Sequence, residues 1–216
     1  MSKSVLDLQN DCLNNSIPCS QLLLKAYAIA RKLNNKQMVD FCKNELNGFQ
    51  NNLDAIPPYR TIRINLRAFN NFEWKSVIVP NNSYLSVHNV AQSEKELETL
   101  CSQEQNYFTI KLSTEEINIL QSACNNKNII DGAKRVPAYL LEGIIFKIRY
   151  IILEWALKLG EDGIWGENLE FTTEEQEKAK STPSIQIIVN GSVTNSNFAG
   201  ILEDSALNIQ TQDKSK

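Results

Sequence analysis

The sequence predicts an α+β protein that is predominantly helical, with a central buried helix at about 136–159, a small antiparallel sheet and a C-terminal β-hairpin tail. Three observations indicate this fold class. Residues 136–159 have apolar side chains around almost the whole helical turn, so protein must surround this helix. Apolar and polar residues alternate at 60–69, as in a half-buried strand. After Thr182-Pro183 the chain becomes rich in Gly, Ser and Asn.

Length and composition fit one globular domain with an appendage. The chain has 216 residues, 42% of them hydrophobic, and a net charge of −3. No global basic field therefore attracts nucleic acid, although a local basic patch stays open as an alternative. With one histidine and five cysteines, none in a CxxC pair, we expect no metal site and reduced thiols in a cytoplasmic protein.

No membrane association is expected from the sequence. The first fifteen residues lack the apolar run of a signal peptide. The apolar helix at 136–159 is long enough to span a bilayer, but four charged residues interrupt it, and charges at membrane depth are costly. These residues are Glu142, Lys147, Arg149 and Glu154.

Three helices are expected in the first fifty residues. The first is a short helix at about 6–13. Ser20 is a suitable N-cap for a second helix at 21–33, because its hydroxyl can accept a hydrogen bond from the first turn. A third helix at 36–47 has a helical apolar stripe and ends at Gly48, where a C′ glycine is common.

The middle of the chain alternates between strand and helix signals. Pro57-Pro58 forbids further helix. Ser93 with Glu96, and Ser113 with Glu116, match the capping-box pattern that opens a helix. Alternating apolar residues predict strands at 60–69, 74–79 and 107–112.

The last part of the body centres on the apolar helix. Residues 125–132 are expected to form a loop, and Pro137 lies in the first turn of the long helix, where proline is tolerated. Gly160 ends that helix. Thr172 opens a short charged helix that reaches about Lys180.

The domain organisation follows from the change in composition near residue 182. We expect a globular domain at 1–181, a β tail at 182–212 and a disordered end at 213–216. Asn190-Gly191 is a strong hairpin signal. A hairpin this small is marginal alone, so residues 184–212 are predicted to dock on the body or to pair with copies of themselves through exposed edges.

Basic and aromatic residues are interleaved along the first predicted hairpin. Such a pattern can bind phosphates and stack bases. The alternative is a solvated outer strand face, whose charges discourage edge aggregation. The near-neutral chain favours that alternative, so nucleic acid is not the favoured partner. The candidate binding residues are Arg60, Arg63, Arg67, Trp74 and Lys75.

Carboxylates cluster late in the chain, and Glu154 lies on the helix predicted to be buried. A buried carboxylate needs a partner, so we interpret it as one half of an ion pair rather than as an acid–base catalyst. The chain contains no Walker A loop and no GxGxxG, HExxH or GxSxG motif. We therefore assign no catalytic residue, cofactor or metal, and expect a protein that is not an enzyme.

Two segments carry motifs in a characteristic order. The first is FCKNELNGF at 41–49, followed by IPPYR at 56–60, and the second is ILEWALKLGEDGIWGENLEFTTEEQEKA at 152–179. Together they resemble the AbiTii domain family of bacterial abortive-infection phage-defence proteins. Phe49 replaces a tyrosine and Gly160 a glutamate of the family pattern. The matching positions are Glu45, Leu46, Asn47, Gly48, Tyr59, Arg60, Trp155, Leu157, Gly163, Ile164, Gly166, Glu167, Phe171 and Glu175.

The resemblance implies a role in growth arrest or death of infected cells, and it implies no catalytic residue. A physical reason for the matched polar positions is a buried hydrogen-bonded network, which fixes a unique packing. We expect an Arg60–carboxylate bridge at its centre. The predicted members are Glu45, Arg60, Glu154 and Glu167.

Three functional hypotheses remain open at this point. The first is a non-enzymatic defence component that binds a phage or host protein and self-associates through residues 184–212. The second is a nucleic-acid-directed toxin, a metal-dependent nuclease that uses the late carboxylates and the basic strand. The third is a structural adaptor unconnected with defence.

Overall fold

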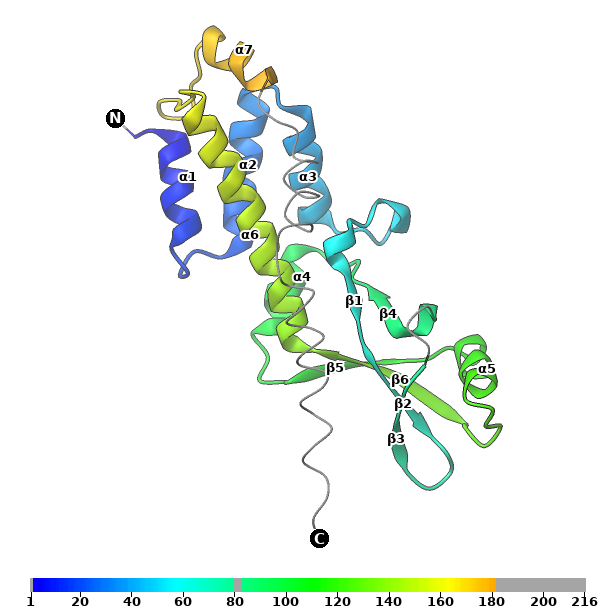
Figure 1. Cartoon of the computed structure of the whole chain (residues 1–216). Helices are drawn as coiled ribbons and strands as arrows, with labels where there is room; N and C mark the ends of the chain where they lie inside the picture. Colours follow the sequence, from blue (N-terminus) through cyan, green and yellow to red (C-terminus); the bar gives the residue numbers. More distant parts are fainter. Residues whose placement is uncertain (1, 80–82, 182–216) are drawn as a thin grey trace.

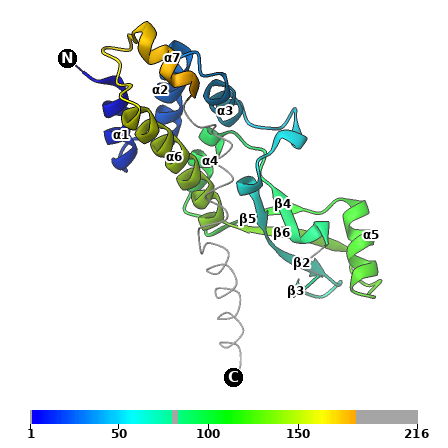
Figure 2. The same cartoon turned by 45° about the horizontal axis from the view of Figure 1, so that its top comes forward.

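The computed structural model describes residues 2–79 and 83–181 (Figure 1). Most helices gather at one end of the molecule, and the four-stranded sheet extends from them toward α5 (Figures 1 and 2). This arrangement confirms a predominantly helical α+β fold. The α-helices are α1 (Ser4–Leu13), α2 (Cys19–Lys32), α3 (Lys36–Asn47), α4 (Glu94–Cys101), α5 (Thr114–Ala123), α6 (Ala138–Glu161) and α7 (Thr173–Ser181). Short 3-10 turns are η1 (Leu53–Ala55), η2 (Pro58–Arg60) and η3 (Tyr84–Ser86).

Local capping signals place most helix ends. Ser93 and Ser113 each accept a hydrogen bond from the backbone of the glutamate three residues later, so both predicted capping boxes form. Gly48 ends α3 with φ +74°, as a C-terminal glycine should. Ser20, however, is not the N-cap of α2. The helix begins at Cys19 after Pro18, and the Ser20 hydroxyl instead donates to Glu98 Oε2 at 2.8 Å.

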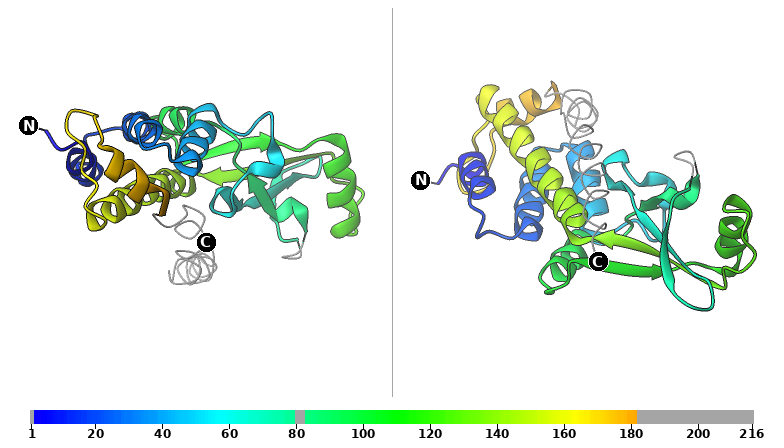
Figure 3. Two further views of the ribbon diagram at one scale, coloured as in Figure 1. Left: turned by 90° about the horizontal axis from the view of Figure 1, so that it is seen from above. Right: turned by 60° about the horizontal axis from the view of Figure 1, so that its bottom comes forward.

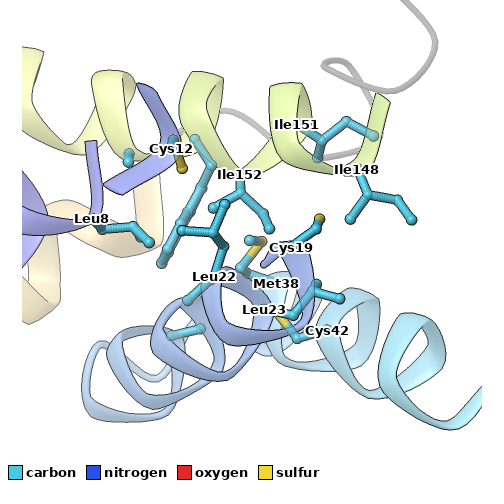
Figure 4. Close-up of a cluster of buried hydrophobic side chains, with 14 of the residues drawn as sticks. Leu8, Cys12, Cys19, Leu22, Leu23, Met38, Cys42, Ile148, Ile151 and Ile152 are labelled. Carbon is cyan, nitrogen blue, oxygen red and sulfur yellow. The ribbon is translucent and has the colours of Figure 1, made fainter. Parts of the chain in front are cut away.

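The main core lies where α1, α2, α3 and α4 pack around α6. Figure 4 shows Leu22 and Leu23 of α2 facing Ile148 and Ile152 of α6. Three of the thiols, Cys12, Cys19 and Cys42, are buried in this core and free. Burial raises the pKa of Cys12 to about 12, so that thiol stays protonated and inert at neutral pH.

Helix α6 is central, but residues 2–79 and 83–181 cover only one side of it. Its buried residues, such as Ile148 and Trp155, face the core. On the opposite side Tyr139 is 58% exposed and Phe146 is 64% exposed. The expectation that protein surrounds the helix therefore holds for one side only. We call the line of Tyr139, Gly143, Phe146, Tyr150, Leu153 and Leu157 the α6 stripe; Gly143 and Leu153 are half-buried, and the other four residues are exposed.

The strands form two antiparallel sheets. The predicted strand at 60–69 is split at Ile64, whose backbone N–H bonds to the Ser86 carbonyl at 3.1 Å. The first half pairs with a short strand to form a two-stranded sheet, and the second half joins a four-stranded sheet of order β3-β2-β6-β5. The strands are β1 (Thr61–Arg63), β2 (Asn65–Phe69), β3 (Trp74–Val77), β4 (Val87–Asn89), β5 (Tyr107–Lys111) and β6 (Asp131–Pro137).

The strand β6 was not predicted. It occupies the end of the expected 125–132 loop and the start of the expected 136–159 helix. It pairs with both β2 and β5, and then passes directly into α6 at Pro137 (Figure 1). The sheet and the longest helix are thus consecutive in the chain.

The four-stranded sheet has two unlike faces. Leu66 and Ala68 of β2 lie on the face that packs against α5, where Lys134 of β6 forms an ion pair with Glu116 at 2.6 Å. Figure 3 shows α5 at the end of the sheet far from the helical bundle. The alternating residues point the other way, and we call that side the open face. It consists of Asn65, Arg67, Phe69, Trp74, Ser76, Tyr107, Thr109, Lys111, Asp131, Ala133, Arg135 and Pro137.

Candidate functional site

The tightest polar cluster joins Arg60 to Glu45, and both side chains are fully buried. The Arg60 Nε donates to the two Glu45 oxygens at 3.2 and 3.1 Å, and Nη2 donates to Oε2 as well. Nη1 donates to the carbonyls of Val90 and Gln92 at 3.1 and 2.8 Å. The Tyr59 hydroxyl donates to Glu45 Oε1 at 2.5 Å. Protein groups therefore bind both carboxylate oxygens and all three guanidinium nitrogens.

The electrostatics of this cluster keep Arg60 charged. Burial lowers the pKa of Arg60, but the charge and hydrogen bonds of Glu45 outweigh it, so the pKa is raised overall. Burial and then the Glu45 charge raise the pKa of Tyr59, which stays a neutral donor. A buried pair with this many hydrogen bonds is typical of a structural centre.

The residues next to Glu45 are explained by the same contact. Gly48 passes close to the 91–93 segment, and a Cβ there would lie 2.8 Å from the Ala91 carbonyl oxygen and from the Ser93 nitrogen. The Phe49 N–H bonds to the Ala91 carbonyl at 2.7 Å. The Arg60 guanidinium lies 5.0 Å from the centre of the Phe49 ring. Both matched motifs, at 45–49 and 59–60, thus meet at one place.

The structure places Glu154 and Glu167 away from Arg60. Glu154 lies on α6 beside Tyr150, whose pKa is raised by burial and then by the Glu154 charge. Glu167 is exposed, and its backbone N–H bonds to the Glu170 carbonyl at 2.9 Å. In the motif at 152–179, the carboxylate with the most backbone contacts is that of Glu175. Its Oε1 accepts hydrogen bonds from the backbone N–H groups of residues 165 and 166 at 2.9 and 3.0 Å.

A buried acid that the sequence did not point to is Glu94. It is fully buried at the start of α4, and neither carboxylate oxygen has a well-placed hydrogen-bond partner among the described residues. Burial, and then the neighbouring Glu98, raise its pKa to about 8. The sequence carries no signal for this, because a glutamate just after an N-cap is typical of an exposed first turn.

The predicted basic set is divided between several environments. Arg60 is enclosed by Glu45, and Arg63 is exposed on β1. Arg67 and Trp74 share the open face. Lys75 lies on the opposite face, where it forms an ion pair with Glu73 at 2.8 Å.

The open face also includes residues that were not among the predicted binding residues. Because β6 joins β2 to β5, Arg67, Arg135 and Lys111 lie on one surface. The Arg135 guanidinium stacks over the Tyr107 ring, 3.2 Å from its centre. The Phe69 and Trp74 rings are paired across the hairpin with centroids 5.6 Å apart. Three cations and three aromatic rings thus share this surface.

The opposite side of the hairpin has a shallow hollow of about 270 Å³ between β3 and the end of α5, lined by Lys75, Val77, Cys124, Asn126 and Ile129 among others.

Within residues 2–79 and 83–181, no three His, Cys, Asp or Glu side chains form a group that fits a metal ion. None of the described helices is long and apolar enough to cross a membrane.

The match to a protein family agrees with the two sets of motifs, which lie at the Glu45–Arg60 centre and at the Glu175 turn. No curated protein and no solved structure matched the chain. The family model of AbiTii matches residues 3–184, which include the Glu45–Arg60 centre and the Glu175 turn. The chain therefore belongs to the AbiTii family of abortive-infection phage-defence domains.

Proposed function

We propose that the protein acts in phage defence as a non-enzymatic binding module that self-associates. The α6 stripe is the observation that carries this proposal. Its four large exposed residues, Tyr139, Phe146, Tyr150 and Leu157, form a continuous apolar line on a helix whose other side is in the core. Contiguous apolar surface of this kind marks an interaction site.

The spacing of the stripe fits a second helix of the same kind. Its positions recur every four and three residues from Tyr139 to Leu157, which is the pattern of a two-helix seam. Gly143 lies in the line and leaves open space above the backbone. Lys147 and Glu154 flank the stripe on one side, seven residues apart, so an antiparallel second copy places opposite charges against each other. A second copy of this chain is therefore the proposed occupant.

The C-terminal tail is the second proposed contributor to assembly. Residues 182–212 and 213–216 lie outside the described residues. The support for their role is the sequence alone, with its apolar run before Asn190-Gly191.

Analytical ultracentrifugation of the full-length protein at neutral pH tests whether it self-associates through the α6 stripe. We expect a wild-type dimer, and a dissociation constant raised about thirtyfold or more by Phe146→Glu, because a charge replaces a central apolar contact. Leu24→Glu is the matched control, since Leu24 is 57% exposed on α2, outside the stripe. A monomeric wild type overturns the proposal. A monomeric 1–181 fragment with an oligomeric Phe146→Glu chain assigns assembly to the tail instead.

The second candidate function is a metal-dependent nuclease. The residues named for it now lie apart, with Arg60 bound to Glu45, Glu154 on α6 and Glu167 exposed near the N-terminus. Incubation with RNA and DNA plus Mg²⁺ distinguishes the two functions. Cleavage that Glu154→Gln or Glu167→Gln abolishes would replace the binding module with an enzyme.

A further inference from the structure

We propose that the open face of the four-stranded sheet binds single-stranded nucleic acid, with phosphates at Arg67, Lys111 and Arg135 and bases against Trp74 and Tyr107. This activity is additional to the assembly proposed above and uses a different surface. It depends on β6, which brings the basic and aromatic residues of distant segments onto one face.

The aromatic side chains of this face are not part of the protein interior. Phe69, Trp74 and Tyr107 belong to neither hydrophobic core cluster of the described chain. Trp74 is 39% exposed and Tyr107 is 42% exposed, although both are large apolar groups on regular strands. In the part of the chain that the structure describes, these rings are available to a ligand.

The basic side chains are arranged around a small residue. Arg67 and Lys111 stand on either side of Ala133 in one row across the sheet, and Arg135 follows two residues along β6. Adjacent strands are about 4.8 Å apart, so the backbones of Arg67 and Lys111 are separated by about 10 Å. Only the methyl group of Ala133, which is itself buried, lies between them.

Protein contacts hold two of these cations beside aromatic rings. The Arg67 Nη2 donates to the Trp74 carbonyl at 2.8 Å, while its buried Nε has no partner among the described residues. The Arg135 guanidinium lies flat on Tyr107 and extends the stacking surface. The one acid of the face, Asp131, accepts the Gly132 N–H at 2.7 Å. The face is thus basic on a protein with a net charge of −3.

The combination of charges and rings selects the ligand. A single strand presents phosphates and unstacked bases together, and each base can stack on an aromatic ring or on a guanidinium plane. A duplex hides the faces of its bases, and an acidic peptide would use Arg67, Lys111 and Arg135 but leave Trp74 and Tyr107 without a partner. The single strand is the ligand that uses every group of this surface.

Fluorescence anisotropy with labelled oligo(dT) and oligo(U), using the full-length protein, tests the proposal. Three phosphate contacts give a salt slope of about −2, and Lys111→Gln should reduce its magnitude by about 0.7. Trp74→Ala and Tyr107→Ala should each weaken binding about tenfold or more. Lys75→Gln is the matched control, because it removes the same charge from the opposite face of the same sheet. It should change affinity less than about twofold.

Several results would overturn this inference. They are equal binding of duplex and single strand, displacement of the oligonucleotide by poly-glutamate of the same charge, and equal effects of Lys75→Gln and Lys111→Gln. Lys111 is exposed, so its substitution keeps the test valid even if an aromatic variant unfolds. Oligonucleotide binding and sedimentation of Phe146→Glu are separate measurements, and failure of one proposal leaves the other standing.

Discussion

Arginines in the helical bundle and in the sheet meet opposite environments, although the two regions follow each other in the chain. Arg60 is enclosed by Glu45 and two backbone carbonyls, with no exposed surface. On the open face, Arg67 donates to the Trp74 carbonyl and Arg135 lies over the Tyr107 ring, and neither arginine forms an ion pair within the described residues. The comparison teaches that the arginine of the family motif is fully enclosed by protein groups, while the two arginines of the open face keep part of their surface exposed.

The largest expected effect comes from the enclosed arginine. Arg60→Ala removes the ion-pair partner of the buried Glu45, so we expect a loss of about 3–5 kcal/mol of unfolding free energy, measured by thermal and denaturant unfolding. Arg63→Ala, an exposed arginine on the next strand, should leave stability nearly unchanged. If Arg60→Ala instead kept its melting temperature and lost phage protection, the Arg60 cluster would serve activity, and its contrast with the open-face arginines would be wrong.

Gly48 tests the same contact through the backbone. Gly48→Ala forces a side chain into a positive φ and against the backbone of residues 91–93, which should cost about 3 kcal/mol in denaturant unfolding. Gly143→Ala is the control, because nothing lies within 4 Å of its Cβ position on α6. That change should raise stability by about 0.5–1 kcal/mol. Equal effects of the two substitutions would contradict the close approach described here.

The buried acid Glu94 predicts a pH dependence of the bundle. Its pKa of about 8 in the folded state lies above the unfolded value of 4.5, so the folded protein keeps a proton that the unfolded chain releases. Stability from this group is present below about pH 4.5 and is lost as pH rises through 8. Glu94→Gln, which does not titrate, should gain on the order of 4 kcal/mol relative to wild type between pH 5 and pH 9.

Melting curves at the two pH values measure that difference. Glu96→Gln on the same helix is the control, because hydrogen bonds from the Ser93 backbone and side chain lower the pKa of Glu96. This substitution weakens the cap at both pH values. A wild type whose stability relative to Glu94→Gln does not change with pH would show that Glu94 is not held neutral.

The smallest effect on stability is expected on the open face. Lys111→Gln should change unfolding free energy by less than about 0.5 kcal/mol, because the side chain is exposed and forms no ion pair among the described residues. The same substitution should weaken oligonucleotide binding. A large loss of stability would show that the open face belongs to the folding machinery, as Arg60 does.

Local signals in the sequence predicted much of the fold. The capping boxes at Ser93 and Ser113 and the glycine at 48 specify helix ends through contacts within a few residues, so they are visible without tertiary structure. The strand β6 was missed because its sequence, DGAKRVP, does not alternate. Lys134 faces the covered side because Glu116 of α5 pairs with it there, a contact that the strand pattern alone cannot reveal.

The candidate sites were predictable only in part, for a related reason. A carboxylate bridge to Arg60 follows from the need to neutralise a buried charge, and Glu45 was among the named residues. Which carboxylate fills that role depends on where α3 ends against the segment at 90–92. The open face requires β6 to join β2 and β5, so Arg135 and Lys111 could not be grouped with Arg67 from spacing alone.

The direct passage of β6 into α6 has a mechanical consequence. Pro137 is the covalent joint between β6 and α6, and its ring fixes φ, which here is −63°. Because this joint restricts rotation, we expect β6 and α6 to move together, so that a tilt of the sheet also changes the direction of the α6 axis. Binding of an oligonucleotide to the open face of the sheet should then alter amide hydrogen exchange along α6.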